Sequence, residues 1–197
     1  MANNIIQIRI HGRGGQGVVT AAELIALAAF YDEQEAQAFP SFGVERTGAP
    51  IMAFARISKN KIKTREQVYR PDFLIIQDAT LIDDVEVISG CQSQTKILIN
   101  STQTRQEIFQ RLKITAQKNK HKFEIKKENI FTAPATEIAL EFIGKNLVNT
   151  VILGALAKHS TLFSLKSLKK AATEKFQDKK KILEKNLTAI QKIYETN

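Results

Sequence analysis

A glycine-rich turn near the start of the chain contains the residue types best suited to bind an anionic ligand. Gly12, Gly14 and Gly17 follow the Gly-x-Gly-x-x-Gly pattern of dinucleotide-binding turns. In this pattern the first glycine permits a tight turn, the second lets the backbone approach a phosphate, and the third allows close helix–strand contact. Backbone N–H groups of the following helix would then face the phosphate, with Arg13 and Gln16 adding contacts.

A second segment of chemical interest lies between Pro40 and Pro50. It contains two glycines and the adjacent charged residues Glu45 and Arg46, and the bounding prolines indicate an ordered loop rather than a linker. Arginine suits phosphate because its planar guanidinium group forms two parallel hydrogen bonds, while the alternative is an ion pair within the loop. The candidate ligand-binding residues are therefore Gly12, Arg13, Gly14, Gly15, Gln16, Gly17, Glu45 and Arg46.

The glycine turn alone leaves three interpretations open. An NAD-binding enzyme carries Asp or Glu at the end of its second strand, where the carboxylate binds the ribose hydroxyls. Here the corresponding residues are Phe39, Pro40 and Ser41, so binding of NAD(P) is the least favoured interpretation. The other two are an anion or phosphate site without NAD, and a turn that is needed only for packing.

The other reactive side chains form no catalytic or metal-binding group that their spacing reveals. His11, His121 and His159 are far apart in the sequence, and Cys91 is the only cysteine. This chain alone therefore cannot hold an iron–sulfur cluster or a cysteine-based zinc ion. Asp78 follows a predicted strand, where a ligand contact and helix capping are equally good interpretations. We predict no catalytic residue and no metal ligand in this chain.

A predicted alternation of strands and helices positions these residues. The β-branched run at residues 5–11 predicts a strand, and the Ala- and Leu-rich run at residues 18–30 predicts a helix that is buried on most of its surface. The continuous apolar run at residues 73–76 is typical of a central parallel strand, whose carboxyl end is where open α/β sheets bind ligands. The other predicted strands are residues 34–39, 51–57, 96–100 and 129–131.

From residue 135 onward the pattern is helical. Helices are predicted up to Gly144 and over residues 147–157, 165–176 and 180–194. We therefore predict one α/β domain over residues 1–197. Its core, residues 1–134, would be a Rossmann-like, mostly parallel sheet flanked by helices, and residues 135–197 would be mostly helical.

Charge and hydropathy restrict the partners. The net charge of +9 arises in residues 100–197, which carry 19 basic and nine acidic residues, whereas residues 1–99 carry ten and eleven. The lysine runs at residues 118–122 and 179–181 lack arginines for base recognition, so we expect solvated surfaces and no nucleic acid. No stretch approaches about 18 uncharged apolar residues, no signal peptide is recognisable, and no disulfide framework is present. We expect a cytoplasmic protein that does not bind membranes.

Two sequence signatures indicate a family. Residues 8–22, around the glycine turn, and residues 38–50, around Glu45 and Arg46, resemble gamma subunits of pyruvate:ferredoxin oxidoreductases, which are 2-oxoacid:acceptor oxidoreductases. Residues 70–73 and 146–155 are similar as well, and the resemblance covers about residues 5–195. Two departures are a minor variation at Thr47 and an insert at about residues 113–127 that we do not match to the family pattern.

The resemblance implies an α/β subunit of a multisubunit enzyme. That enzyme would oxidatively decarboxylate a 2-oxoacid, with pyruvate favoured, and use coenzyme A to give an acyl-CoA, carbon dioxide and reduced ferredoxin. Its partners would be alpha, beta and delta-type subunits, which would hold thiamine diphosphate, Mg²⁺ and [4Fe–4S] clusters. This chain would supply structure and part of the coenzyme A site, with Arg13, Arg46 and the glycine turn facing the anionic ligand. The alternatives are a stand-alone NAD(P)-type Rossmann enzyme and a pure assembly module.

Overall fold

The computed structural model describes residues 5–41, 46–120 and 122–196 of the chain. Six strands form one sheet: β1 (Ile6–Arg13), β2 (Glu35–Pro40), β3 (Pro50–Ser58), β4 (Phe73–Ile76), β5 (Lys96–Asn100) and β6 (Ile130–Ala133). The α-helices are α1 (Val18–Tyr31), α2 (Leu81–Asp84), α3 (Arg105–Lys118), α4 (Ala135–Ile138), α5 (Val148–His159), α6 (Leu165–Phe176) and α7 (Lys180–Glu195). A 3₁₀ turn, η1 (Lys127–Asn129), and a π-helical turn, η2 (Ala139–Ile143), complete the described elements.

The sheet has the strand order β2-β3-β1-β4-β5-β6. Neighbouring strands β1, β4, β5 and β6 are parallel, whereas β3 is antiparallel to both β1 and β2. The predicted α/β class with a mostly parallel sheet is therefore confirmed. The glycine turn and α1 do not lead to the neighbouring strand, however, because β3 lies between β1 and β2. The short connection between β2 and β3 explains this difference, since a parallel return requires a crossover of a dozen or more residues.

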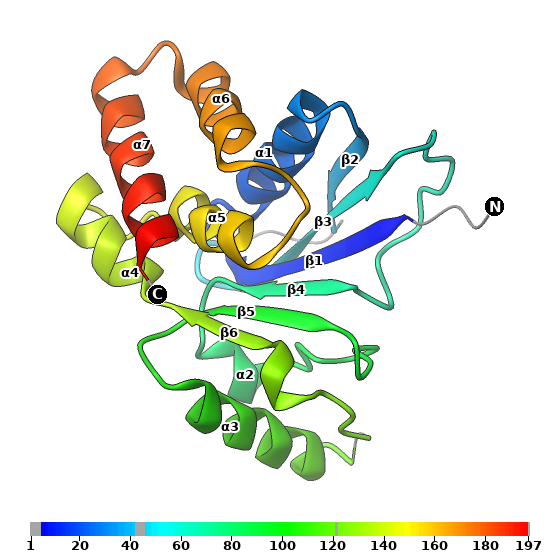
Figure 1. Cartoon of the computed structure of the whole chain (residues 1–197). Helices are drawn as coiled ribbons and strands as arrows, with labels where there is room; N and C mark the ends of the chain where they lie inside the picture. Colours follow the sequence, from blue (N-terminus) through cyan, green and yellow to red (C-terminus); the bar gives the residue numbers. More distant parts are fainter. Residues whose placement is uncertain (1–4, 42–45, 121, 197) are drawn as a thin grey trace.

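Helices cover the sheet on both faces. Figure 1 shows α1, α5, α6 and α7 on one face, and α2 and α3 on the other. Strand β1 serves both faces because its side chains alternate: Ile8 and Ile10 are fully buried in the larger core under α1 and α5, and Arg9 and His11 point to the opposite face. The smaller core joins β4 and β5 to α2 and α3.

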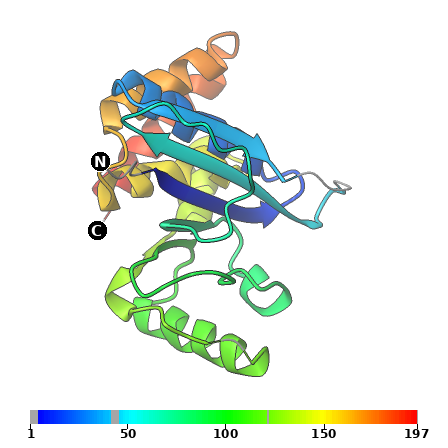
Figure 2. The same cartoon turned by 90° about the vertical axis from the view of Figure 1, so that its right-hand side faces the viewer.

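The second face is covered unevenly. Helices α2 and α3 pack against β4, β5 and β6, but the half formed by β1, β2 and β3 is crossed by the irregular segment of residues 59–72 (Figure 2). The side chains of Arg9 and Arg56 and the Gln37 side chain reach from the strands to carbonyl groups of this segment. None of the described helices is long and apolar enough to cross a membrane.

The predicted elements lie close to the observed ones. The predicted helices at residues 165–176 and 180–194 correspond to α6 and α7, and Gly144 ends η2 with a positive φ of 80°. Helix α3 was not predicted, because it is a largely exposed helix with few apolar residues. Its start nevertheless carries a readable signal: the Thr104 side chain accepts from the backbone N–H of Glu107, whose carboxylate accepts from the backbone N–H of Thr104.

Candidate functional site

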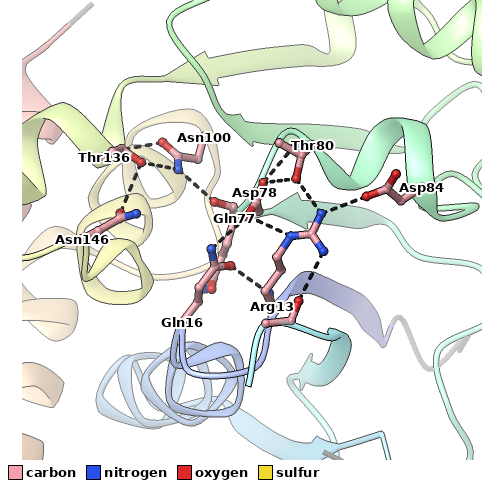
Figure 3. A network of polar contacts seen from close by, with 10 residues as sticks. Arg13, Gln16, Gln77, Asp78, Thr80, Asp84, Asn100, Thr136 and Asn146 are labelled. Carbon is pink, nitrogen blue, oxygen red and sulfur yellow. Dashed lines mark hydrogen bonds and ion pairs between the residues drawn. The ribbon is translucent and has the colours of Figure 1, made fainter. Parts of the chain in front are cut away.

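Polar side chains gather at the carboxyl ends of β1, β4 and β5. Strand β1 is followed by a helix on one face of the sheet and β4 by a helix on the other, so the chain diverges between these two neighbouring strands. Such a divergence leaves a crevice that open α/β sheets use for ligands. Figure 3 shows that side chains from the glycine turn, from the end of β4 and from the end of β5 converge here.

The glycine turn packs directly against the loop that precedes β3. The backbone N–H of Gly14 donates to the carbonyl oxygen of Ala49 at 2.8 Å, and the N–H of Gly48 donates to the carbonyl of Gly14 at 3.0 Å. A Cβ atom on Gly14 would overlap the carbonyl oxygen of Arg46. The two segments singled out in the sequence are thus neighbours. Position 14 requires a glycine because the chain's own backbone, at Arg46, occupies the space that a side chain would need.

Gly12 and Gly17 exchange the roles that the sequence pattern assigns to them. Gly12 lies within β1, and a Cβ there would be 2.5 Å from Cγ2 of Val18, so Gly12 provides the close contact between strand and helix. Gly17 precedes α1 with a φ of 71°, and a Cβ there would lie 2.5 Å from Nδ2 of Asn149 in α5. Gly17 therefore makes the tight turn and lets α5 approach. Gly15 also has a positive φ, 92°, and a Cβ there would lie 3.9 Å from Cγ2 of Thr47, an ordinary contact distance.

The guanidinium group of Arg13 is engaged by the protein itself. Its Nη2 lies 2.9 Å from a carboxylate oxygen of Asp84 and donates to the Thr80 hydroxyl at 2.7 Å. Its Nε lies 3.3 Å from Asp78, and Nη1 donates to the carbonyl of Gly48 at 3.3 Å. Two carboxylates thus neutralise this cation, which ties the glycine turn to α2 and to the loop. Arg13 holds the site together, with its charge already balanced.

Asp78 is the acceptor that connects the turn to the end of β4. Its carboxylate accepts from the Gln16 side-chain amide at 3.0 Å and from the backbone N–H of Thr80 at 3.0 Å. Burial alone raises the pKa of Asp78, but the hydrogen bonds from Thr80 and Gln16 and the charge of Arg13 bring it below its ordinary value. Asp78 is therefore ionised at neutral pH. The Thr80 contacts lie before α2, whose first turn has no side-chain cap, so they do not make Asp78 a helix cap.

A second group of polar side chains continues from β4 to the helical part. The Asn100 side-chain amide donates to the carbonyl of Gln77 at 2.9 Å and to the Thr136 hydroxyl at 2.8 Å, and its oxygen accepts from the backbone N–H of Thr136 at 3.1 Å. Thr136 then contacts Asn146. The Gln77 side chain is 1% exposed, and both of its amide atoms lack a hydrogen-bond partner. Its Oε1 lies near Gly12.

Two helix N-termini meet beside these side chains. Neither α1 nor α5 has a side-chain cap, and the contact of Gly17 with Asn149 brings their first turns together. The first backbone N–H groups of a helix have no intrahelical acceptor, and the helix dipole favours negative charge there. Together with the orphaned amide of Gln77, this arrangement favours an anion over a cation at the edge of the sheet.

The other candidate residues have different surroundings. Arg46 is exposed, whereas Glu45 lies outside the described residues, so their predicted pairing is not described. His11 is 3% exposed; burial, reinforced by the charge of Arg9, lowers its pKa to about 3, so its imidazole is neutral. Burial raises the pKa of the Cys91 thiol to about 11. Among the described residues there is no group of three or more His, Cys, Asp or Glu that could hold a metal ion.

Sequence reasoning missed Gln77, Asn100 and Thr136 as members of this site. Each of them has a signal that could have been used, because Gln77 and Asn100 end apolar strand runs and Thr136 follows Pro134 at the start of a helix. Carboxyl ends of neighbouring parallel strands meet at one edge of a sheet, so such residues converge once the strand order is known. The strand order was the missing information.

The chain is similar to known proteins over nearly its whole length. The family model described as pyruvate ferredoxin/flavodoxin oxidoreductase matches residues 7–196. The chain is 43% identical to pyruvate synthase subunit PorC of Methanocaldococcus jannaschii over 190 residues, which cover 96% of each protein. It is 39% identical to the pyruvate/ketoisovalerate oxidoreductases common subunit gamma of Pyrococcus furiosus, over 97% of this chain and 96% of that protein.

Solved structures show the same similarity. Pyruvate oxidoreductase subunit PORC of Thermotoga maritima superimposes with a TM-score of 0.77 at 31% identity, covering 97% of this chain and 96% of that one. The 2-oxoglutarate:ferredoxin oxidoreductase of Magnetococcus marinus superimposes with a TM-score of 0.68 at 22% identity. This second match covers 98% of this chain but only 31% of the larger chain, and it indicates a shared fold.

Proposed function

Because the chain belongs to the pyruvate ferredoxin/flavodoxin oxidoreductase family, we propose that it is the gamma subunit of a multisubunit 2-oxoacid:ferredoxin oxidoreductase. The reaction is the oxidative decarboxylation of a 2-oxoacid with coenzyme A, which yields an acyl-CoA, carbon dioxide and reduced ferredoxin. Pyruvate is the favoured substrate, because the pyruvate synthase subunit of M. jannaschii is 43% identical over 96% of both proteins. That identity is the observation that carries the proposal.

The chemistry is divided among the subunits. This chain has a single cysteine, whose thiol burial keeps protonated, and a neutral buried histidine beside its glycine turn. These groups cannot ligate a [4Fe–4S] cluster or exchange protons with a substrate. The family resemblance implies that alpha, beta and delta-type partner subunits hold thiamine diphosphate, Mg²⁺ and the [4Fe–4S] clusters and reduce ferredoxin, and the composition of this chain is consistent with that division. The cytoplasm, where coenzyme A and ferredoxin are available, is the compartment of the assembly.

Purification through a tagged copy of the full chain tests this proposal. We expect it to recover partner subunits that contain iron and thiamine diphosphate, and the recovered assembly to reduce ferredoxin faster with pyruvate than with 2-oxoglutarate or 2-ketoisovalerate. The tagged chain expressed alone is the control and is expected to be inactive with all three. Recovery of the chain without any thiamine-containing partner would contradict the proposal.

The site at the end of β1 supplies part of the coenzyme A site. A coenzyme A phosphate would face the first N–H groups of α1, with the exposed Arg46 closing over it and the buried Gln77 amide behind it. In this arrangement Arg13 is a positioning residue, because Asp78 and Asp84 already neutralise its charge. The candidate residues of the proposed site stay Gly12, Arg13, Gly14, Gly15, Gln16, Gly17, Glu45 and Arg46.

Replacement of Arg46 tests the coenzyme A site. We expect Arg46→Ala, measured in the purified assembly, to raise the KM for coenzyme A by roughly 3- to 30-fold through loss of a charge-assisted hydrogen bond, with the KM for pyruvate unchanged. Arg105→Ala, at an exposed arginine on α3, is the matched control. An unchanged KM for coenzyme A would show that Arg46 does not bind it. Gly14→Val is unsuitable, because its side chain would displace the Arg46 carbonyl.

The alternative of a stand-alone NAD(P) enzyme has no support from the geometry. In a dinucleotide-binding fold the acidic residue that binds the ribose follows the strand next to β1. Here β3 lies next to β1 and runs antiparallel, and β2, which ends in Phe39 and Pro40, is one strand further away.

A further inference from the structure

A strongly basic segment crosses the half of the second sheet face that α2 and α3 leave uncovered. Residues 59–70, here named the basic strap, connect β3 to β4 and carry five basic residues and one acidic residue. All five basic side chains, Lys59, Lys61, Lys63, Arg65 and Arg70, are exposed. The remainder of residues 1–99 has an excess of acidic residues, so the strap is a local concentration of positive charge.

The basic strap is fixed to the sheet although it has no regular secondary structure. Ile62 and Val68 anchor it as buried side chains. The guanidinium group of Arg56 on β3 donates to the carbonyls of residues 66 and 67, and that of Arg9 on β1 donates to the carbonyls of residues 68 and 69. Two arginines thus bind four successive carbonyl groups. A partner would therefore meet a surface that is already ordered, which lowers the entropic cost of binding.

The same two arginines add to the positive potential under the strap. Arg9 is 6% exposed and Arg56 is 1% exposed. In the described parts of the chain neither has a carboxylate within ion-pair distance, and both bind neutral carbonyl groups instead. Glu66 of the strap interacts electrostatically with Arg56, whereas Arg9 has no such carboxylate among the described residues. The strap and these two arginines therefore carry seven basic residues against one acidic residue, and the like charges repel one another. Carboxylates on a partner would reduce this repulsion on docking.

The exposed residues of the basic strap have the composition of a binding surface. Tyr69 is 65% exposed. Its neighbour in the sequence is Arg70, and Arg65 lies four residues before it. Tyrosine and arginine are the residue types that dominate the binding energy of protein interfaces. An exposed tyrosine close to the exposed Arg65 and Arg70 is therefore better explained by a partner than by solvation alone.

The basic surface continues beyond the strap. Arg70 lines a pocket of about 270 Å³ together with Gln92, Lys122 and Glu124, and Glu124 forms an ion pair with Lys122. Lys122 belongs to a lysine-rich stretch that begins at the end of α3, in which the described basic side chains are all exposed, namely Lys118, Lys120, Lys122, Lys126 and Lys127. The pocket joins the two stretches, so a single partner face can contact both.

We propose that the basic strap docks a carboxylate-rich face of another subunit in the same assembly. This inference rests on the proposed function, and it names the surface and the chemistry through which the partner is held. A protein is favoured over nucleic acid because the strap is neither a helix nor a ribbon that fits a groove, and it offers one exposed aromatic ring where a stacking platform needs several. Charge complementarity of this kind acts on orientation and association rate, and it weakens with salt.

Charge reversal within the strap tests the inference. The remaining subunits are co-expressed, and the purified full chain is titrated into them at about 50 and 300 mM salt, with complex formation followed by light scattering. We expect Lys61→Glu/Lys63→Glu to weaken binding at least tenfold at low salt and to abolish most of the salt dependence. Lys180→Glu/Lys181→Glu is the matched control, since it makes the same charge change at exposed lysines of α7 and is expected to bind as the unmodified chain does.

Each other outcome has a distinct meaning. Equal binding by the two double variants, or by Lys61→Glu/Lys63→Glu and the unmodified chain, would overturn the docking surface and leave the proposed function intact. Binding of a 20-nucleotide single strand that the same substitutions abolish, with subunit binding unaffected, would replace the protein partner with nucleic acid. Failure of the unmodified chain to bind any of the subunits would overturn both proposals.

Discussion

His11 illustrates how a reactive residue type loses its reactivity through its position. It lies in β1 directly before Gly12 of the glycine turn, where a histidine could face a ligand or be satisfied locally. Its imidazole points to the face opposite the α1 core, where it is 3% exposed and its Nε2 has no hydrogen-bond partner. Burial, together with the charge of Arg9, keeps it neutral, with a pKa of about 3. The residue is a buried part of the sheet.

A consequence of this burial is a dependence of stability on pH. The pKa of His11 in the folded chain lies below that of an unfolded histidine, about 6.5, so the unfolded state binds a proton first as the pH falls. The stabilising effect of neutral His11 is complete above about pH 6.5 and is lost progressively toward pH 3. Between pH 7.5 and 5 the free energy of unfolding should fall by about 2 kcal/mol less in His11→Gln than in the unmodified chain.

Urea unfolding of the two proteins at both pH values measures this difference. A spectroscopic signal of tertiary structure at pH 5 confirms that both are folded at the start. Equal losses of unfolding free energy in His11→Gln and the unmodified chain would show that the imidazole is protonated in the folded state.

For Gly12, Gly14 and Gly17 too, the position in the fold decides what the residue does. Their spacing predicted a turn followed by a helix, and this arrangement is present. The pattern did not show which atoms come close. Val18, Asn149 and the Arg46 carbonyl occupy the space where side chains at positions 12, 17 and 14 would lie. Those neighbours come from three separate parts of the chain, which a local pattern cannot specify.

At the scale of elements, periodicity identified most strands and helices but not their pairing. The predicted strand at residues 51–57 is β3, yet the sequence did not indicate that it would insert between β1 and β2. Strand order depends on long-range contacts and on loop length rather than on the composition of each strand. Helix α3 was not predicted for a local reason: a mostly exposed helix has a weak apolar pattern. Its Thr104 cap is nevertheless clear.

The crossing of α5 and α7 depends on one glycine. Gly154 lies in the buried helix α5, and a Cβ there would be 2.5 Å from both the carbonyl oxygen of Ile190 and Cγ2 of Ile193 in α7. Gly154→Ala gains roughly 1 kcal/mol of helix propensity but forces two backbones apart, which costs about 1–3 kcal/mol and exposes apolar surface of α7. We expect a net loss of stability and faster amide hydrogen exchange in α7.

Chemical denaturation followed by hydrogen exchange measures this effect. Thr188→Ala, at an exposed position of α7, is the control and is expected to change the unfolding free energy by less than about 0.5 kcal/mol. A Gly154→Ala variant that is as stable as the unmodified chain would show that α7 can shift without cost.

At the scale of the whole molecule, the sheet separates two tasks. One face carries α1, α4, α5, α6 and α7 over the larger core, and the other carries α2, α3 and the basic strap. The charge arithmetic located the basic excess in residues 100–197 and therefore missed the strap, which is hidden in a nearly neutral half of the sequence. Its significance became visible only when the exposed side chains and the buried Arg9 and Arg56 were seen together. A member of this family that carries such a basic surface is suited to work within an assembly.

The most direct test of that conclusion is a reconstitution with and without this chain. The proposed partner subunits are co-expressed either alone or with it, and the reduction of ferredoxin that depends on both pyruvate and coenzyme A is measured. The account predicts strong activity only when the chain is present and none for the chain by itself. Full activity of the other subunits in its absence, or turnover of pyruvate by the isolated chain, would contradict the account.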